Sequence, residues 1–175
     1  MSENALPSSL HALIVMGVAG SGKSTIAQAL AARIGWTFKD GDLFHPPGNV
    51  EKMRSGHPLT DEDRWPWLRA IADEIDRTRQ AAGHIIIACS ALKRVYRDIL
   101  IGSRRGVALI YLRGSRDLIG QRLRERRGHF MPPQLLDSQF ATLEEPDVGE
   151  RAIVADVAST VDAIVDHIVG QLRRR

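Results

Sequence analysis

Cysteine and long apolar segments are nearly missing from this sequence. Cys89 is the only cysteine among 175 residues, so an internal disulfide cannot form. The longest purely apolar runs, Ala12–Met16 and Ile85–Cys89, are much shorter than the roughly 20 residues that span a bilayer. The start, MSENALPSSLH, has no basic leader before an apolar stretch, so we expect no signal peptide. These absences favour a cytoplasmic protein without a membrane partner.

Lysine is scarce as well, since only Lys23, Lys39, Lys52 and Lys93 accompany the arginines among the 24 basic residues. The net charge is +3 and the isoelectric point is about 9.4. Most arginines stand among acidic residues on expected helices, so we expect no nucleic-acid partner. With 43% apolar and 26% charged residues, residues 1–175 are expected to form one globular domain, with residues 1–10 flexible.

Short apolar runs alternate with longer amphipathic segments, which is typical of a parallel sheet covered on both faces. We expect strands at Ala12–Met16, Thr37–Lys39, Ile85–Ala88, Val107–Leu112 and Ile153–Val157. We expect helices at Ser24–Ile34, Val50–Ser55, Leu92–Leu100, Asp117–Arg127, Pro133–Leu143 and Val161–Arg173. We also expect a long helix that has Thr60 or Asp61 as its N-cap and is ended by Gly83, and a loop at Gly41–Gly48. The predicted fold class is α/β, a three-layer sandwich with a five-stranded parallel sheet.

The segment after the first strand, GVAGSGKS at residues 17–24, fits the phosphate-binding pattern G-x-x-x-x-G-K-[ST]. It lies between an expected strand and an expected helix, which is the context that the pattern requires. Glycines allow a tight turn, and the backbone N–H groups and the helix dipole attract phosphate. Lys23 would reach the β- and γ-phosphates, and Ser24 would bind Mg²⁺. The predicted nucleotide contacts are Gly17, Val18, Ala19, Gly20, Ser21, Gly22, Lys23, Ser24 and Thr25.

Two carboxylates, Asp40 and Asp42, follow the second expected strand. Ligands of parallel sheets bind at the carboxyl ends of the strands, so both are expected near the phosphate loop. One could hold Mg²⁺ and the other could orient or deprotonate an attacking hydroxyl, and the pattern does not decide which. Cys89 and Ser90 follow the third strand, where a motor or switch NTPase usually has an acid. We expect Cys89 to be a small buried residue.

Several cations are candidate contacts for a second, anionic substrate: Arg54, Arg64 and Lys93, with Lys52 as a further possibility. His45 and His57 are expected in loops, and His45 is kept as a candidate substrate contact. Arg122 and Arg126 share a helix face, where like charges repel unless an anion lies between them. This predicts a lid at about residues 120–135 that closes over the γ-phosphate, with a solvated basic helix as the alternative.

Four stretches together resemble the gluconate kinases, in the shikimate-kinase-like branch of the P-loop small-molecule kinases: MGVAGSGKST, DGDLFHPPGNVEKMRSGHPLTDEDRWPWL, CSALKRVYRD and RERRGHF. They cover most of residues 16–145 in the family's order. The resemblance implies a P-loop kinase fold and ATP-dependent phosphorylation of D-gluconate at its 6-hydroxyl. The products would be 6-phospho-D-gluconate and ADP, and the family implies Mg²⁺ and a homodimer.

The resemblance also assigns roles to individual residues. Asp42 would contact the substrate hydroxyl, and Asp40 would assist Ser24 at the metal. Arg64 would hold the substrate carboxylate, with Lys93 nearby. The expected catalytic residues are therefore Lys23, Asp42 and Arg126, and Arg122 is expected to contact the nucleotide. A weaker match suggests that the stretch around Asp156–Thr160 covers adenine.

Three other functions share part of this pattern. Another small-molecule or nucleotide kinase would have every feature on the ATP side, so only the acceptor would distinguish it. A guanine-nucleotide switch would need an N-K-x-D motif and an acid after the third strand, and the sequence has neither. A kinase of RNA or DNA ends is compatible with the basic helix, but the chain is small and lacks a surface of interleaved basic and aromatic residues.

Overall fold

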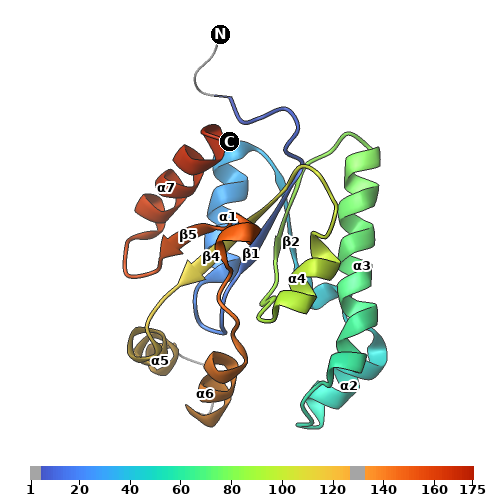
Figure 1. The fold of residues 1–175 in the computed structure, drawn as a ribbon. Coiled ribbons are helices and arrows are strands. Elements are labelled where there is room, and N and C mark those ends of the chain that lie inside the picture. Colours follow the sequence, from blue (N-terminus) through green and yellow to red (C-terminus); the bar gives the residue numbers. More distant parts are fainter. Residues whose placement is uncertain (1–4, 127–132) are drawn as a thin grey trace.

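The computed structural model describes residues 5–126 and 133–175 and arranges them around one parallel sheet (Figure 1). The strand order is β2-β3-β1-β4-β5. The strands are β1 (Ala12–Met16), β2 (Thr37–Asp40), β3 (Ile85–Ala88), β4 (Val107–Arg113) and β5 (Ile153–Asp156). The helices are α1 (Lys23–Ile34), α2 (Pro47–Arg54), α3 (Asp61–Gln80), α4 (Arg94–Leu100), α5 (Arg116–Glu125), α6 (Pro133–Thr142), α7 (Val161–Arg173) and the short 3-10 helices η1 (Gly41–Phe44) and η2 (Val148–Glu150).

Helices cover both faces of this sheet, which confirms the predicted α/β sandwich with five parallel strands. In Figure 1, α1 and α7 pack together on one face, and α3 and α4 pack on the other. β1 and β3 are buried along their whole length because both of their faces are covered. The apolar stripe predicted for α7 is also buried, except for the exposed Val161 in its first turn; the buried positions are Ile164, Val165, Ile168, Val169 and Leu172.

The predicted helix boundaries around two loops are wrong. α4 begins at Arg94 instead of Leu92, because Ala91 has a positive φ of 46° and Lys93 is extended. α2 begins at Pro47, inside the segment predicted as a loop, since a proline in the first turn has its φ preset for a helix. The same predicted loop also contains η1. Both differences lie beside the strand ends that form the cavity described below.

The remaining boundaries differ by one to three residues. α5 spans Arg116–Glu125 instead of Asp117–Arg127, since Ser115 Oγ accepts the Leu118 N–H at its start and Arg126 is extended at its end. β2 and β4 each extend one residue further than predicted, and β5 ends one residue earlier. α1 begins one residue earlier, α6 ends one residue earlier, and α3 ends at Gln80 instead of continuing to Gly83.

Two segments predicted to be mobile are only partly described. In the first ten residues, Leu10 is buried and Leu6 packs against the core, while residues 1–4 lie outside the described residues. Of the lid predicted at about residues 120–135, residues 127–132 lie outside them as well. Across the described ranges, none of the helices combines the length and the apolar character that crossing a membrane requires.

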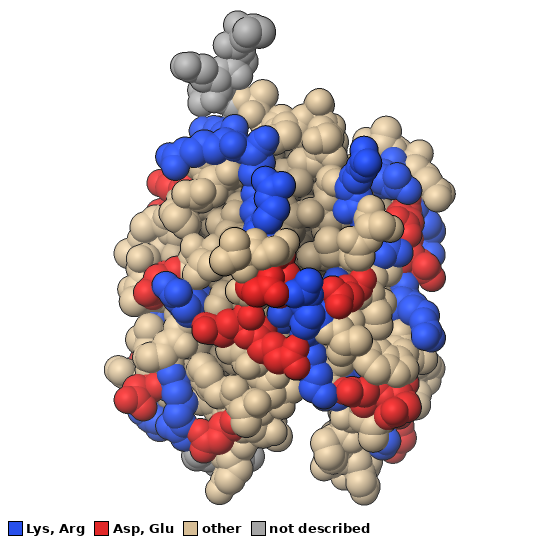
Figure 2. All heavy atoms as spheres, viewed as in Figure 1, with Lys and Arg blue, Asp and Glu red and all other residues tan. Residues whose placement is uncertain are grey.

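Charges of both signs are interspersed on the face of the molecule seen in Figure 2. Several basic residues have acidic partners, for example Arg94 with Asp147 at 2.6 Å and Arg104 with Asp76 at 2.9 Å. The same view shows the molecule hollowed between the region around α6 and the region around α2. This hollow opens at the end of the sheet where the strands terminate.

A capping box fixes the start of α3, at one of the two positions that the sequence indicated. Thr60 Oγ1 accepts the Asp63 N–H at 3.2 Å, and Asp63 Oδ2 accepts the Thr60 N–H at 2.8 Å. Lys52 of α2 donates to the same carboxylate oxygen at 2.6 Å. These hydrogen bonds lower the pKa of Asp63 to about 2, and the bond from Lys52 contributes more than the bond from the Thr60 N–H. One carboxylate thus caps α3 and joins it to α2.

This carboxylate is expected to make the stability of the protein depend on pH. Its pKa is about 2 in the folded state and 3.8 ordinarily, so its stabilisation is complete above about pH 4 and is lost as the pH falls through 2. We expect Asp63→Asn to lower the melting temperature at pH 7, and the difference from wild type to close between pH 4 and pH 2. Thermal unfolding followed by circular dichroism measures this.

The matched control is Asp73→Asn, because Asp73 is exposed on the same helix and has no ion pair within the described ranges. This control should unfold with wild-type pH dependence. An Asp63→Asn difference that stayed constant from pH 7 to pH 2 would show that the carboxylate does not carry the effect.

Candidate active site

The loops after β1 and β3 meet at the carboxyl end of the sheet. β1 lies between β3 and β4, and the chain leaves β1 towards β2 but leaves β3 towards β4, which is a topological switch point. At this point the Gly17 N–H donates to the Ser90 carbonyl at 3.3 Å. Gly22, which caps α1, has a φ of 92°, a conformation that glycine adopts readily. The predicted phosphate loop therefore lies where ligands of open α/β sheets bind.

Lys23 is the charged residue of this loop. Its Nζ donates to the Val18 carbonyl at 3.1 Å, so the side chain curls back over the loop. Burial lowers the pKa of Lys23, while the nearby Cys89, Asp42 and Asp40 act in the opposite direction. An ammonium in such surroundings attracts an anion more strongly than it would in water.

The two predicted aspartates lie opposite this lysine. Ser24 Oγ donates to Asp40 Oδ2 at 3.2 Å, and the Asp42 N–H donates to Asp40 Oδ1 at 2.9 Å. Gly41, between the two acids, is needed for this path, because a Cβ there would lie 2.6 Å from the Ala88 carbonyl oxygen. β2 can therefore bring both carboxylates close to the end of β3.

These groups line one cavity of about 240 Å³. Its charged and polar side chains are Lys23, Ser24, Asp40, Asp42, Ser90, Arg126 and Gln139. A neighbouring cavity of about 420 Å³ shares Gly20, Gly22 and Arg126 with it. That second cavity is also lined by Arg122, Thr25 and the segment Val157–Val161. The structure thus brings the predicted loop, both aspartates and both arginines together around two adjoining cavities.

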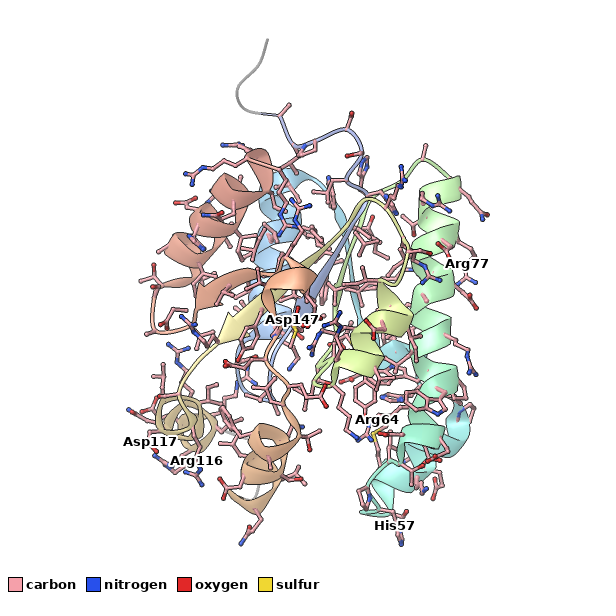
Figure 3. All side chains as sticks on the ribbon, in the orientation of Figure 1. His57, Arg64, Arg77, Arg116, Asp117 and Asp147 are labelled. Carbon is pink, nitrogen blue, oxygen red and sulfur yellow. The ribbon has the colours of Figure 1, made fainter. Side chains whose placement is uncertain are left out.

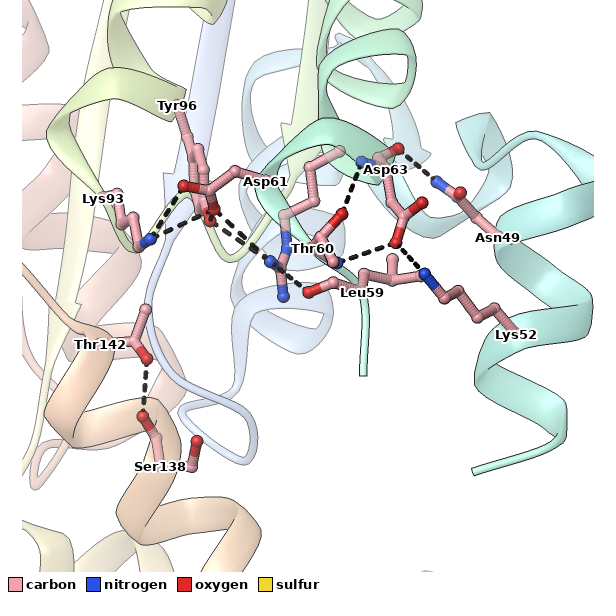
Figure 4. Close-up of polar contacts among 11 residues, drawn as sticks. Asn49, Lys52, Leu59, Thr60, Asp61, Asp63, Lys93, Tyr96, Ser138 and Thr142 are labelled. Atoms are coloured by element: carbon pink, nitrogen blue, oxygen red, sulfur yellow. Dashed lines mark hydrogen bonds and ion pairs between the residues drawn. The ribbon is translucent and has the colours of Figure 1, made fainter. Parts of the chain in front are cut away.

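A second polar cluster brings together Arg64 and Lys93. Figure 4 shows Asp61 in contact with Lys93 and Tyr96. Lys93 Nζ lies 3.1 Å from Asp61 Oδ2, and Arg64 Nη1 lies 3.8 Å from Asp61 Oδ1. The Tyr96 hydroxyl and then Lys93 lower the pKa of Asp61, and the pKa of Lys93 is raised by its bond to Asp61. Two cations therefore share one carboxylate at this place.

The remaining sequence candidates lie apart from one another. His45 stacks on Trp67 with ring centroids 4.2 Å apart, and burial lowers its pKa. In Figure 3, Arg64 lies beside the start of α3 and towards the middle of the molecule, whereas His57, between α2 and α3, lies at its lower edge. Arg54 is exposed on α2 and lies 3.7 Å from Glu51. The structure does not bring Arg54 to the two cavities.

Cys89 is buried at the end of β3, as the sequence predicted. Burial raises the pKa of its thiol to about 12, so it is a neutral thiol at neutral pH and unsuited to bind a metal as thiolate. Asp40 and Asp42 are the only acidic residues that line either of the two cavities within the described ranges.

Sequence reasoning missed three residues of these sites. Asp61 and Tyr96 complete the cluster of Arg64 and Lys93, and Gln139 reaches the phosphate loop from α6. Asp61 stood inside a quoted stretch of the sequence, but its contact with residues of α4 depends on how α3 packs. No local signal indicates Gln139, because its contact with Ala19 spans 120 residues.

Comparison with known proteins agrees with this geometry. The family model described as shikimate kinase matches residues 19–171. The gluconokinase of Gluconobacter oxydans (strain 621H) is 46% identical over 158 residues, covering 90% of this chain and 88% of that protein. The thermoresistant gluconokinase of Escherichia coli (strain K12) is 41% identical over 165 residues, covering 94% of each.

Solved structures give the same result. A gluconokinase from Sinorhizobium meliloti 1021 is 44% identical, with a TM-score of 0.84 over 94% of this chain and 92% of that one. A shikimate kinase from Aquifex aeolicus vf5, at 13% identity and a TM-score of 0.60, shares the fold over 93% of this chain and 96% of that one. The chain therefore belongs to the gluconokinases, within the shikimate kinase family of P-loop kinases.

Proposed function

We propose that this protein transfers the γ-phosphoryl group of ATP to the 6-hydroxyl of D-gluconate, giving 6-phospho-D-gluconate and ADP. The observation that carries this is the cavity where Lys23 and Ser24 of the phosphate loop face Asp40 and Asp42. It places phosphate-binding groups beside carboxylates that can act on an alcohol. The similarity to gluconokinases over nine-tenths of the chain supports gluconate as the acceptor.

The nucleotide would occupy both adjoining cavities. Its phosphates would bind the ammonium of Lys23 and those backbone N–H groups of residues 17–25 that do not already donate to a protein acceptor, as Gly17, Ala19 and Ser21 do. The adenosine would enter the larger cavity, where the segment Val157–Val161 supplies a partly apolar wall. Arg122 and Arg126 line that cavity too, which supports their assignment to the phosphates. Arg126 lines both cavities and would stabilise the charge on the group in transfer.

Ser24 and Asp40 would hold Mg²⁺. Their oxygens lie 3.2 Å apart beside the loop, and hard oxygen ligands of this kind are those that Mg²⁺ prefers. Bound there, the ion would neutralise charge on the phosphate oxygens. Asp42, on the next turn of the chain, would orient the 6-hydroxyl and accept its proton.

The carboxylate of gluconate would bind at the cluster of Arg64 and Lys93. Asp61 is the one carboxylate paired with these two cations among the described residues, so the three side chains keep one net positive charge, which suits a monocarboxylate. His45, which stacks on Trp67, would contact the hydroxyl groups of gluconate. Arg54 stays a prediction of the sequence, since it is exposed on α2.

The experiment that tests the function is ADP release with Mg-ATP and D-gluconate, shikimate, AMP or glucose as acceptor. Turnover with gluconate and little with the other three compounds is expected. Turnover with another acceptor would keep the nucleotide site and overturn the gluconate assignment. ADP release that no acceptor increases would overturn the kinase function.

The homodimer and the cytoplasmic location expected from the sequence are also proposals. The mass of the purified protein by light scattering tests the first, and cell fractionation tests the second. A monomer at micromolar concentration, or recovery outside the cytoplasmic fraction, would overturn the corresponding expectation.

Removing the base is expected to slow transfer without releasing the nucleotide. For Asp42→Asn we expect kcat to fall by about 100-fold or more, because loss of a general base typically costs that much. The affinity for Mg-ATP, measured by calorimetry, should stay within about twofold of wild type. Asp73→Asn, on the exposed face of α3, is the control. A wild-type kcat in Asp42→Asn would rule out this role.

Weakening the metal site is expected to change the Mg²⁺ requirement. For Asp40→Asn we expect the Mg²⁺ concentration at half-maximal activity to rise by roughly 10-fold or more, since a charged oxygen beside the ion is lost. Excess Mg²⁺ should restore part of the activity, and the KM for gluconate should change little. An unchanged Mg²⁺ titration would place the ion elsewhere.

A further inference from the structure

One side chain reaches the phosphate loop from a distant part of the chain. Gln139 of α6 accepts the Ala19 N–H through Oε1 at 2.7 Å. A backbone N–H can only donate, so the amide oxygen must face the loop and Nε2 remains as a donor. Nε2 makes no hydrogen bond within residues 5–126 and 133–175. Gln139 also lines the cavity that holds Lys23 and both aspartates.

The helix that carries Gln139 is well fixed. Leu136, almost one turn earlier, is buried, and Phe140 packs against the core. Asp137 forms an ion pair with Arg116 of α5. Just after α6, the Glu144 N–H donates to the Leu92 carbonyl at 2.8 Å. Gln139 therefore stands on a helix that packs against the core and is joined to α5.

The tip of the loop, residues 18–21, has apolar contacts with other elements, since Val18 is buried in the core and Leu123 of α5 lies close to Gly20, but it has few polar ones. Gly17, Gly20 and Gly22 all have positive φ values, of 156°, 80° and 92°, so the chain there has much conformational freedom to lose. The hydrogen bonds of Val18, from the Ser21 N–H and from Lys23, stay within the loop region itself. Among the described hydrogen bonds, the bond to Gln139 ties the tip to another element.

We infer that Gln139 is a positioning residue for phosphoryl transfer: it holds the tip of the phosphate loop in its binding conformation through the Ala19 N–H. The inference rests on the proposed kinase function. Donors that are already in place stabilise developing charge without having to reorganise during the reaction. A misplacement of about 1 Å can cost on the order of 100-fold in rate. The neutral Nε2 donor also suits a cavity that receives phosphate anions.

The test compares Gln139→Leu with wild type. Leucine keeps a similar size but cannot accept the Ala19 N–H. Gln134→Leu is the matched control, because Gln134 is exposed on the same helix. Three quantities are measured for each protein: hydrogen exchange at the Ala19 amide by NMR, Mg-ATP affinity by calorimetry, and kcat and KM with gluconate. Thermal unfolding confirms that each variant is folded.

In Gln139→Leu we expect faster exchange at Ala19, Mg-ATP affinity weakened by about 3- to 10-fold, and kcat lowered by about 10- to 100-fold, with the KM for gluconate within about twofold. The control should match wild type in all three. Unchanged Mg-ATP binding would overturn the inference, because the bond to Ala19 would then not matter for the nucleotide. Tighter binding would overturn it too, because Gln139 would then compete with the phosphates.

Faster exchange at Ala19 together with a wild-type kcat would overturn the inference as well. A raised KM for gluconate at unchanged kcat would also overturn it, because Gln139 would then belong to the acceptor site. The exchange and affinity measurements need no acceptor. A wild-type enzyme inactive on gluconate would therefore refute the proposed function, while the inference about Gln139 would still be decided.

Discussion

The parallel pairing of β1 with β3 is the constraint on which the site depends. It sets Val15 beside Ala88, so the loops that follow both strands start at the same level of the sheet. The Cys89 N–H then donates to the Val15 carbonyl at 3.1 Å, and the Ser90 carbonyl accepts the Gly17 N–H. β2 pairs with β3 in the same direction and brings Asp40 beside Ala88. The phosphate loop and the two aspartates meet because β1, β2 and β3 end at the same edge of the sheet.

A buried ion pair fixes the two connections that flank this edge. Arg97 is only 2% exposed and binds Glu150 through Nε at 2.6 Å and through Nη2 at 2.9 Å. Its Nη1 donates to the carbonyls of Ala91 and Leu92, each at 3.0 Å. A buried guanidinium needs such complete pairing, because an unpaired charge there would be very costly. The pair therefore locks the loop that carries Lys93 to the segment that follows α6.

The features predicted correctly from the sequence are those whose physical cause is local. The pattern of a phosphate loop has its glycines, lysine and serine within eight residues, and the start of α3, with Thr60 as its N-cap, is set within four. The five strands follow from apolar runs that both faces of the sheet bury. Boundaries were less accurate where single residues decide them, such as Ala91 with its positive φ.

What the sequence could not predict depends on distant packing. Asp61 is 35 residues from Tyr96, and Gln139 is 120 residues from Ala19, so neither pair leaves a spacing to recognise. Arg54 is a candidate whose role stays a prediction. It is a cation in a stretch that resembles the family, yet α2 turns it outward beside Glu51. Residue type and motif position do not fix the direction of a side chain on a short helix.

The lysines show how charge is distributed over the molecule. Lys39 binds Glu74, Lys52 binds Asp63 and Lys93 binds Asp61, so each of these three has a carboxylate partner. In contrast, Lys23 has only the Val18 carbonyl as a hydrogen-bond partner among the described residues. Burial without a paired anion is what lowers its pKa. A bound phosphate would supply the missing negative charge and would favour the protonated form of Lys23. Burial of this lysine without an anionic partner therefore strengthens its attraction for the phosphates of the nucleotide.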